Sequence, residues 1–305
     1  MELTKSKIKL LEHAANIRTK SVMDRDDIGF STRVLVQCNL PHSDPGNELP
    51  MWSRTNGNTC LSIQPRWYMK NGHPVCIGYP HGNIPRLILV YLCTQAVQTK
   101  SKHILLGKSL SKFMKSIDLE ITGGQYGTIN RFKEQMWRLL SCSISFTYDS
   151  TEMKAIRNTT IAHNVQLWWD TEKSNHKDKE EFDSYIELSD EFIQEIWSYP
   201  IPIDKEIICA IKQSPLALDL YAWLTYRVVY LEKPIRVSWM SLSGQVGSEY
   251  INLKEFARKA KEALSKIYIF WPELQIEEVK GGLILKPSKP SIPLKAFSPI
   301  ICKHK

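Results

Sequence analysis

The strongest chemical signal in the sequence is a stripe of polar side chains along residues 252–267. Apolar residues recur in this segment at helical spacing, which predicts a helix that buries one face. The opposite face carries residues spaced four, three and four apart: Lys254, Arg258, Lys261 and Ser265. Long cationic side chains bind phosphates and the edges of guanine bases. The stripe therefore predicts a helix that contacts DNA.

An ordinary solvated helix face is the alternative interpretation of the same segment. Lys259 and Lys266 flank the stripe, and Glu255 and Glu262 stand four residues before them, where they could form ion pairs. We include Lys259 in the predicted DNA-binding set, because its charge adds to the attraction for a polyanion.

A lysine-flanked turn follows this helix. Gly281 and Gly282 predict a tight β-hairpin. Lys280 and Lys286 lie at its tip and its far end, which suits a wing that lies along the sugar–phosphate backbone. A solvated turn without a ligand explains the same residues.

A weaker version of the stripe occurs earlier, on the predicted helix at residues 126–140. Arg131, Gln135 and Arg138 share one face there, with Thr128 one turn before them. We predict that these three also contact DNA, although Trp137 nearby could instead make the helix a dimer contact.

An internal repeat positions both helices. Residues 85–97 and 215–226 are similar apolar segments that begin with proline, which favours the first turn of a helix. Each is followed by a short extended piece, a short helix, a glycine-containing turn, a longer amphipathic helix and β-like sequence. For the first copy we assign this β-like sequence to residues 142–148 and 160–169. This order is that of a winged helix, a helix-turn-helix variant whose third helix enters the major groove. The repeat therefore predicts an α+β fold with tandem winged-helix domains.

Charge helps to divide the chain. Residues 170–195 contain ten acidic and three basic side chains, although the whole chain has a net charge of +8. We expect this stretch to connect two basic modules and to face solvent or another protein. Ser189 followed by acidic residues predicts a helix start inside it. The predicted divisions are an N-terminal arm (residues 1–48), a first winged helix (49–169), an acidic connector (170–200), a second winged helix (201–295) and a C-terminal tail (296–305).

Length and composition exclude several classes of protein. The 305 residues are 43% hydrophobic and 24% charged, which is typical of a globular protein of about two domains. No apolar run approaches the roughly 20 residues that span a bilayer, and the N-terminus does not resemble a secretory signal. We expect a cytoplasmic protein without a membrane partner. Its seven scattered cysteines are expected to be free thiols, several of them buried.

Catalytic signals are weak. Gly107, Lys108 and Ser109 resemble the end of a P-loop, but Lys102 stands where its first glycine is required. His73, Cys76 and their neighbours Cys60 and His81 lack the paired spacing of a zinc site. We therefore predict no enzymatic activity, catalytic residue, metal or cofactor.

Several short segments occur in a characteristic order and spacing along the chain. They are residues 78–86 (GYPHGNIPR), 95–101 (QAVQTKS), 121–124 (ITGG) with Gly127, Arg131, Gln135 and Met136, 212–221 (KQSPLALDLY), 223–227 (WLTYR) and 247–250 (GSEY). No segment alone is diagnostic, but together they make the sequence resemble the RepA-type plasmid replication initiators over roughly residues 49–295. Gln95 and Gln98 depart from the charged residues expected there, and residues 1–50 have no counterpart.

This resemblance implies a non-catalytic, sequence-specific DNA-binding initiator that recognises repeats at a plasmid origin. It also implies recruitment of the host helicase or initiator, control of copy number by repression of its own gene, and a homodimer in equilibrium with a monomer. A winged-helix transcriptional regulator without origin activity is the alternative within DNA binding. Two further classes stay open: a nicking enzyme that uses a tyrosine, and a protein adaptor that binds through Trp168 and Trp169.

Overall fold

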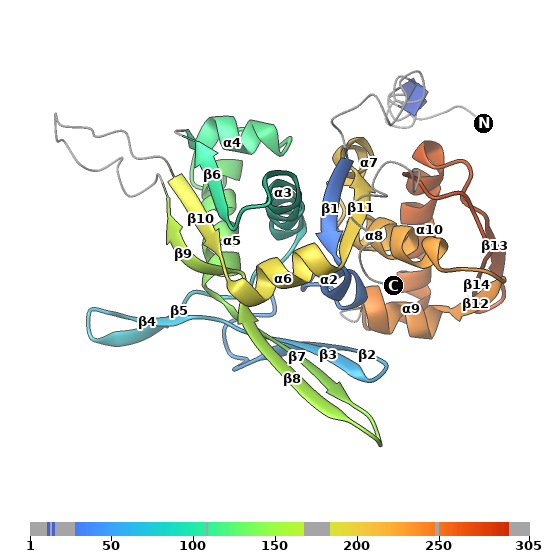
Figure 1. Ribbon diagram of the computed structural model, residues 1–305, viewed down its shortest axis with the longest axis horizontal. Helices are drawn as coiled ribbons and strands as arrows, with labels where there is room; N and C mark the ends of the chain where they lie inside the picture. The colour runs from blue at the N-terminus through green and yellow to red at the C-terminus, as the bar shows by residue number, and fades with distance from the viewer. Residues whose placement is uncertain are drawn as a thin grey trace.

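Two hydrophobic cores organise the computed structural model (Figure 1). The structure describes residues 11–12, 14–15, 28–107, 109–167, 184–247 and 250–292. One core belongs to an N-terminal unit that extends to the end of helix α6, and the other to a C-terminal unit that follows it. The mixed α+β class predicted from the sequence is confirmed. Residues 296–305, Cys302, Lys108, Trp168 and Trp169 lie outside the described residues.

The N-terminal unit contains a three-helix, three-stranded arrangement. Its sheet has the order β6-β10-β9, with both pairs antiparallel. The elements in chain order are α3 (Asn83–Thr99), β6 (His103–Gly107), α4 (Leu110–Ser116), α5 (Thr128–Ser141), β9 (Ala162–Gln166) and β10 (Ser184–Leu188).

The C-terminal unit repeats this arrangement. Its sheet has the order β12-β14-β13, again antiparallel, so that the last strand lies in the middle in both units. Gly281 has a φ of +81° in the turn between β13 and β14, which forms the expected tight hairpin. The elements are α8 (Pro215–Val229), β12 (Ile235–Ser238), α9 (Trp239–Val246), α10 (Leu253–Phe270), β13 (Ile276–Val279) and β14 (Gly282–Leu285).

Local sequence signals explain where these helices begin. The Ser214 hydroxyl accepts a hydrogen bond from the Ala217 N–H at 3.2 Å and caps α8, with Pro215 in its first turn. Asn252 caps α10 in the same way through the Lys254 N–H, at 2.9 Å. Ser189 caps α6 (Asp190–Ser198), as the sequence predicts.

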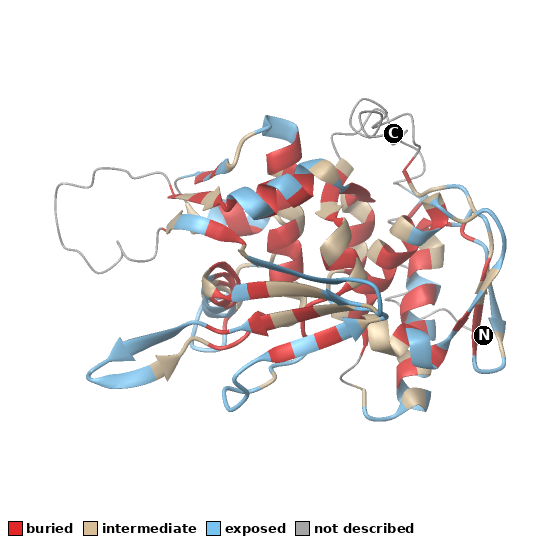
Figure 2. Ribbon diagram, turned by 60° about the horizontal axis from the view of Figure 1, so that its bottom comes forward, coloured by how far each residue is buried: buried red, intermediate tan, exposed pale blue. Residues whose placement is uncertain are grey.

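The N-terminal unit also carries β-structure that its counterpart lacks. A four-stranded sheet has the order β2-β3-β7-β8, and the β4–β5 hairpin extends from the unit, with β4 exposed along its whole length (Figure 2). These strands are β2 (Trp52–Asn56), β3 (Thr59–Gln64), β4 (Trp67–Lys70), β5 (His73–Cys76), β7 (Ser143–Asp149) and β8 (Lys154–Thr160).

Two segments lie elsewhere than the sequence suggested. The strand at residues 143–149 pairs with β3 and β8 and not with β9, whose partner is β10. Strand β10 lies within the stretch assigned to the acidic connector, yet Ile186 and Leu188 are fully buried. Strand β10 pairs with β6 and β9 and is the central strand of the first sheet, and its residues alternate between buried and half-buried. Residues 184–198 therefore belong to the N-terminal core and not to a solvated connector.

The segment assigned to an N-terminal arm also enters the fold. Strand β1 (Ile28–Thr32) pairs with β11 (Pro200–Asp204), and α2 (Arg33–Gln37) packs against α8 (Figure 1). Leu35 lies in the first core and Val36 in the second. Helix α7 (Lys205–Ile211) follows β11. Residues 28–37, which form β1 and α2, therefore contact both units.

Six cysteines in the described part of the chain are free thiols, of which Cys38, Cys93 and Cys142 are buried. Burial raises the pKa of Cys142 to about 12, which keeps this thiol protonated and unreactive. Among the described helices, none combines the length and apolar character needed to cross a bilayer.

Candidate nucleic-acid interface

Helix α10 presents the predicted cationic stripe to solvent. Phe256, Ala260 and Ile267 are fully buried against the C-terminal core and hold one face of the helix inward. The four stripe residues lie on the opposite face, and all are exposed: Lys254, Arg258, Lys261 and Ser265. The amphipathic spacing therefore predicted correctly which side of this helix faces outward.

Acidic neighbours partly neutralise the stripe. Arg258 forms an ion pair with Glu262 one turn later, and Lys259, which is half-buried, approaches the same carboxylate at 3.4 Å. Lys261 pairs with Glu278 of strand β13 at 2.5 Å. Exposed ion pairs of this kind are weak, so a phosphate can replace the carboxylate at little cost. Lys254, at the start of α10, makes no ion pair with any described residue.

The hairpin lies beside the middle of α10. The Trp239 N–H donates to the Gly281 carbonyl at 3.0 Å, and the Lys261 ammonium lies 6.0 Å from the centre of the Trp239 ring. The tip carries Lys280, which is exposed. Lys286 lies at the end of β14, half-exposed and paired with Glu277 at 2.8 Å. The helix and the hairpin thus lie side by side, joined by the Lys261–Glu278 ion pair.

A close backbone approach fixes the hairpin in this position. A Cβ on Gly282 would lie 2.2 Å from the Val237 carbonyl oxygen, so a side chain there would push β14 away from β12. The turn before α10 has a similar requirement, since a Cβ on Gly247 would lie 2.5 Å from the Phe256 ring.

Helix α5 has a different environment. Arg131 is exposed, as predicted, but Gln135 and Arg138 are only 6% and 8% exposed. The Gln135 side-chain oxygen accepts a hydrogen bond from the backbone N–H of His81 at 2.8 Å. The prediction that Gln135 and Arg138 face DNA is therefore corrected, because both side chains are used inside the protein.

The contacts of Arg138 show what this arginine does instead. Its guanidinium donates to the Asp44 carboxylate at 2.9 Å and to the Tyr79 carbonyl at 3.2 Å, and it hydrogen-bonds Glu134 at 2.5 Å. Burial raises the pKa of Asp44, but the hydrogen bonds from Arg138 and from the Gly46 N–H, together with the nearby positive charge, outweigh this effect and hold the pKa below its ordinary value. Gly78 has a φ of +90°, which favours glycine, and a Cβ there would lie 2.8 Å from the Arg138 guanidinium carbon, so a side chain would also displace the guanidinium.

Comparisons with known proteins place the chain in a family. The family model described as plasmid-encoded RepA protein matches residues 79–240, which is more than half of the chain. The chain belongs to the plasmid-encoded RepA protein family. The match runs from the segment before α3 to the first residues of α9, so the α10 stripe lies beyond it. No curated protein matches this RepA-family chain significantly.

Solved structures show where the fold of this RepA-family chain recurs. A crystal structure of RctB domains 2–3 is similar with a TM-score of 0.51 and 12% identity, over 83% of this chain and 96% of that chain. A selenomethionine derivative of domains 2 and 3 of RctB gives a TM-score of 0.53 at 12% identity, over 81% and 94% of the two chains. The similarity thus spans both units.

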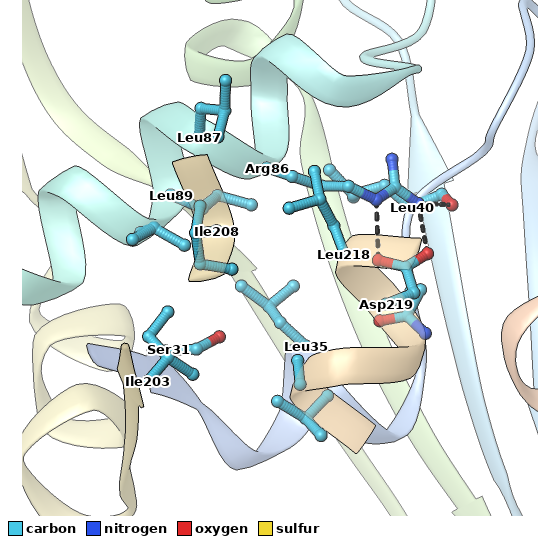
Figure 3. A pocket seen from close by; sticks show the side chains of 14 residues that line it. Ser31, Leu35, Leu40, Arg86, Leu87, Leu89, Ile203, Ile208, Leu218 and Asp219 are labelled. Carbon is cyan, nitrogen blue, oxygen red and sulfur yellow. Dashed lines mark hydrogen bonds and ion pairs between the residues drawn. The ribbon is translucent and has the colours of Figure 1, made fainter. Parts of the chain in front are cut away.

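The matched region of the RepA-family chain contains a buried ion pair that joins its two units. Arg86 of α3 donates two hydrogen bonds of 2.7 Å to the Asp219 carboxylate of α8, from Nε and Nη2 (Figure 3). The same guanidinium donates to the carbonyl of Leu40 at 2.7 Å, and His42 Nε2 lies 2.8 Å from Asp219. Both partners are almost fully buried.

Electrostatic interactions keep the Asp219 carboxylate ionised beside Arg86, and burial keeps His42 neutral. Burial alone would raise the pKa of Asp219, but the charge and hydrogen bonds of Arg86 and the hydrogen bond of His42 together outweigh it, and the pKa lies below its ordinary value. Burial lowers the pKa of His42, despite the raising effect of Asp219, so the imidazole is neutral at pH 7. Helical periodicity and net charge did not predict this pair, although Arg86 and Asp219 are isolated charges in two apolar helices that the repeat aligns. An isolated charge in each of two apolar helices is the sequence signal that predicts such a buried ion pair.

Proposed function

We propose that this RepA-family chain is a plasmid replication initiator that binds repeated duplex sites at an origin through two winged-helix units. The observation that carries the proposal is the exposed stripe of α10. It lies on the third helix of a unit whose element and strand order match those of a winged helix. In that fold the third helix enters the major groove and the hairpin follows the backbone.

The proposed contacts fall into two kinds. Arg258, in the middle of the stripe, can form the bidentate contact with guanine that specifies sequence. The surrounding cations are suited to phosphates, which position the protein without reading the bases. These are Lys254, Lys259, Lys261, Lys280 and Lys286, with Ser265 as a neutral donor and Arg131 as the contact from the N-terminal unit.

We further propose the partners that the family implies: the host replicative helicase or initiator, and a second copy of the chain in a dimer that exchanges with the monomer and represses its own gene. The proposed role is non-catalytic, requires no cofactor and is carried out in the cytoplasm. The arm, connector and tail divisions at residues 1–48, 170–200 and 296–305 stay predictions, modified by the core contacts of residues 28–48 and 184–198.

Fluorescence anisotropy tests DNA binding directly. The full chain is titrated onto labelled DNA from upstream of its own gene and onto a scrambled duplex, at two salt concentrations. We expect at least about 10³-fold tighter binding to the native DNA. Equal binding to both duplexes, with a steep salt dependence, would mean that the basic surface recognises only phosphates.

A replication assay separates an initiator from a transcriptional regulator. The chain is supplied in trans to a replicon that carries the origin but lacks its initiator gene. We expect replication with the wild-type chain and its loss with the Arg258→Ala variant. Specific binding without replication would favour the regulator.

A further inference from the structure

We infer that the base of the hairpin in the C-terminal unit holds a second DNA-phosphate site, built on Arg227 and Arg236. The inference rests on the proposed function, because the ligand is the backbone of the duplex that α10 contacts. An open pocket of about 510 Å³ lies there between the end of α8, strand β12 and helix α9. Both arginines line it, and both are exposed.

The charge of this pocket is unbalanced. Its lining contains two guanidinium groups and, among the described residues, no carboxylate. This differs from α10, where Glu262 and Glu278 pair with the cations. Two unneutralised cations that share one pocket repel each other, and a bound anion removes this repulsion. The pocket therefore favours an anionic ligand.

Both arginines are held in place while keeping donors for a ligand. The Arg227 guanidinium carbon lies 5.9 Å from the centre of the Trp223 ring, and the Trp223 indole N–H donates to Gln245 at 2.9 Å. Arg236 donates from one terminal nitrogen to the Lys280 carbonyl at 2.8 Å. No hydrogen bond joins the Arg227 guanidinium to another described residue. Arginine forks of this kind match the geometry of a phosphate.

A neutral donor completes the site. The Ser241 hydroxyl, which also lines the pocket, accepts a hydrogen bond from the Gln245 amide at 3.3 Å. Its own hydrogen is then available to a phosphate oxygen. Together with the two arginines, this provides donors from α8, β12 and α9.

A series of contacts connects the pocket to the α10 stripe. Arg236 binds the carbonyl of Lys280, and the next residue in the turn, Gly281, accepts the Trp239 N–H. The Trp239 ring in turn lies beneath the Lys261 ammonium. The pocket thus adjoins the surface that α10 and the hairpin form. This position suits a backbone phosphate at the edge of the groove that α10 enters.

Salt dependence of DNA binding tests the site. Arg227→Gln, Arg236→Gln and the double variant are titrated onto the native and scrambled duplexes. Each lost phosphate contact reduces the slope of log K against log salt by about 0.9, so we expect a decrease of about 2 in the double variant. Affinity should fall equally for both duplexes, leaving their ratio unchanged. Unchanged slopes would overturn the inference.

Control variants separate the site from net charge and from folding. Lys70→Gln removes one exposed charge at the end of β4, on the far side of the molecule from the C-terminal unit (Figure 1), and should leave the slope at the wild-type value. The Arg227→Lys/Arg236→Lys variant should restore the slope, since it keeps both charges. Thermal melts should coincide for all variants, because the replaced groups are exposed.

Neutral methylphosphonate linkages locate the contact on the DNA. Each linkage is placed at one position of the duplex at a time. At the phosphate that the pocket contacts, the linkage should weaken DNA binding by the wild-type chain but should not change binding by the double glutamine variant. ATP shares the phosphate chemistry and is titrated without DNA as a comparison. ATP binding that the double variant loses, with an unchanged DNA slope, would assign the pocket to a free nucleotide and overturn the inference.

The outcomes for the two proposals are distinct. Failure of the wild-type chain to bind duplex DNA removes the proposed function itself. Specific binding that Arg258→Ala weakens but the double glutamine variant leaves unchanged removes only the second phosphate site.

Discussion

Helices α5 and α10 occupy the same place in the two units, yet Arg138 of α5 and Arg258 of α10 have opposite environments. Arg138 of α5 is buried and bound to Asp44 and the Tyr79 carbonyl, whereas Arg258 of α10 is exposed and pairs with Glu262 on its own helix. Segments around residues 44 and 79–81 cover α5, whereas among the described residues no segment covers the outer face of α10, where the stripe is exposed. Equivalent helices in a repeat therefore need not have equivalent functions, because a segment added to one unit can cover its polar face.

The largest effect is expected where a buried arginine joins the units. Arg86→Ala leaves the Asp219 carboxylate buried without its partner, and we expect the free energy of unfolding to fall by about 3–5 kcal/mol. Urea unfolding measures this loss. A double variant, Arg86→Met with Asp219→Leu, should recover part of it, because no unpaired charge stays in the interior. A loss below 1 kcal/mol in Arg86→Ala would contradict a structural role for the pair.

Arg138→Met tests the structural role assigned to α5. The change breaks the contacts with Asp44 and the Tyr79 carbonyl, and we expect a loss of stability of roughly 1–3 kcal/mol. The DNA affinity of the folded fraction should not change. Weakened DNA binding at unchanged stability would return Arg138 to the interface and would remove the contrast with α10.

Arg258→Ala tests the opposite role on α10. Loss of a bidentate guanine contact should cost about 1–3 kcal/mol of binding to the native site and little on scrambled DNA. Lys254→Ala, the matched variant on the same stripe, should weaken binding to both duplexes alike. Anisotropy measures both. Equal losses on the two duplexes for both variants would remove base reading from the proposal.

The smallest effect concerns acid stability. Because burial lowers the pKa of His42 below its ordinary value of about 6.5, the unfolded chain binds this proton before the folded chain does. Stability should therefore fall as the pH drops below about 7, by at most about 1.4 kcal/mol per pH unit from this group. His42→Gln, which keeps a donor for Asp219, should lose less stability between pH 7.5 and pH 5.5. Parallel curves for the two proteins would contradict a neutral His42.

The sequence predicted the C-terminal unit better than the N-terminal unit. In the C-terminal unit, helix α10, its exposed face and the Gly281–Gly282 hairpin all follow from local signals: helical periodicity and a glycine pair. Neighbouring residues in the chain supply all of these signals. In the N-terminal unit, β9 pairs with a strand that lies beyond residue 183, in a stretch whose acidic composition suggested solvent. Composition averaged over that stretch hid the alternating burial of β10.

By itself the sequence determined the family, the mixed α+β class, the repeated order of elements and the apolar face of each long helix, because these depend on periodicity, caps and turns within short segments. Tertiary structure alone decided which polar faces stay open to a ligand. Asp44 and His81 reach Arg138 and Gln135 from positions more than 50 residues away, and Arg86 reaches Asp219 across 133 residues. A buried polar group must find a partner wherever the chain folds back upon it, and the residues next to it in the sequence do not identify that partner.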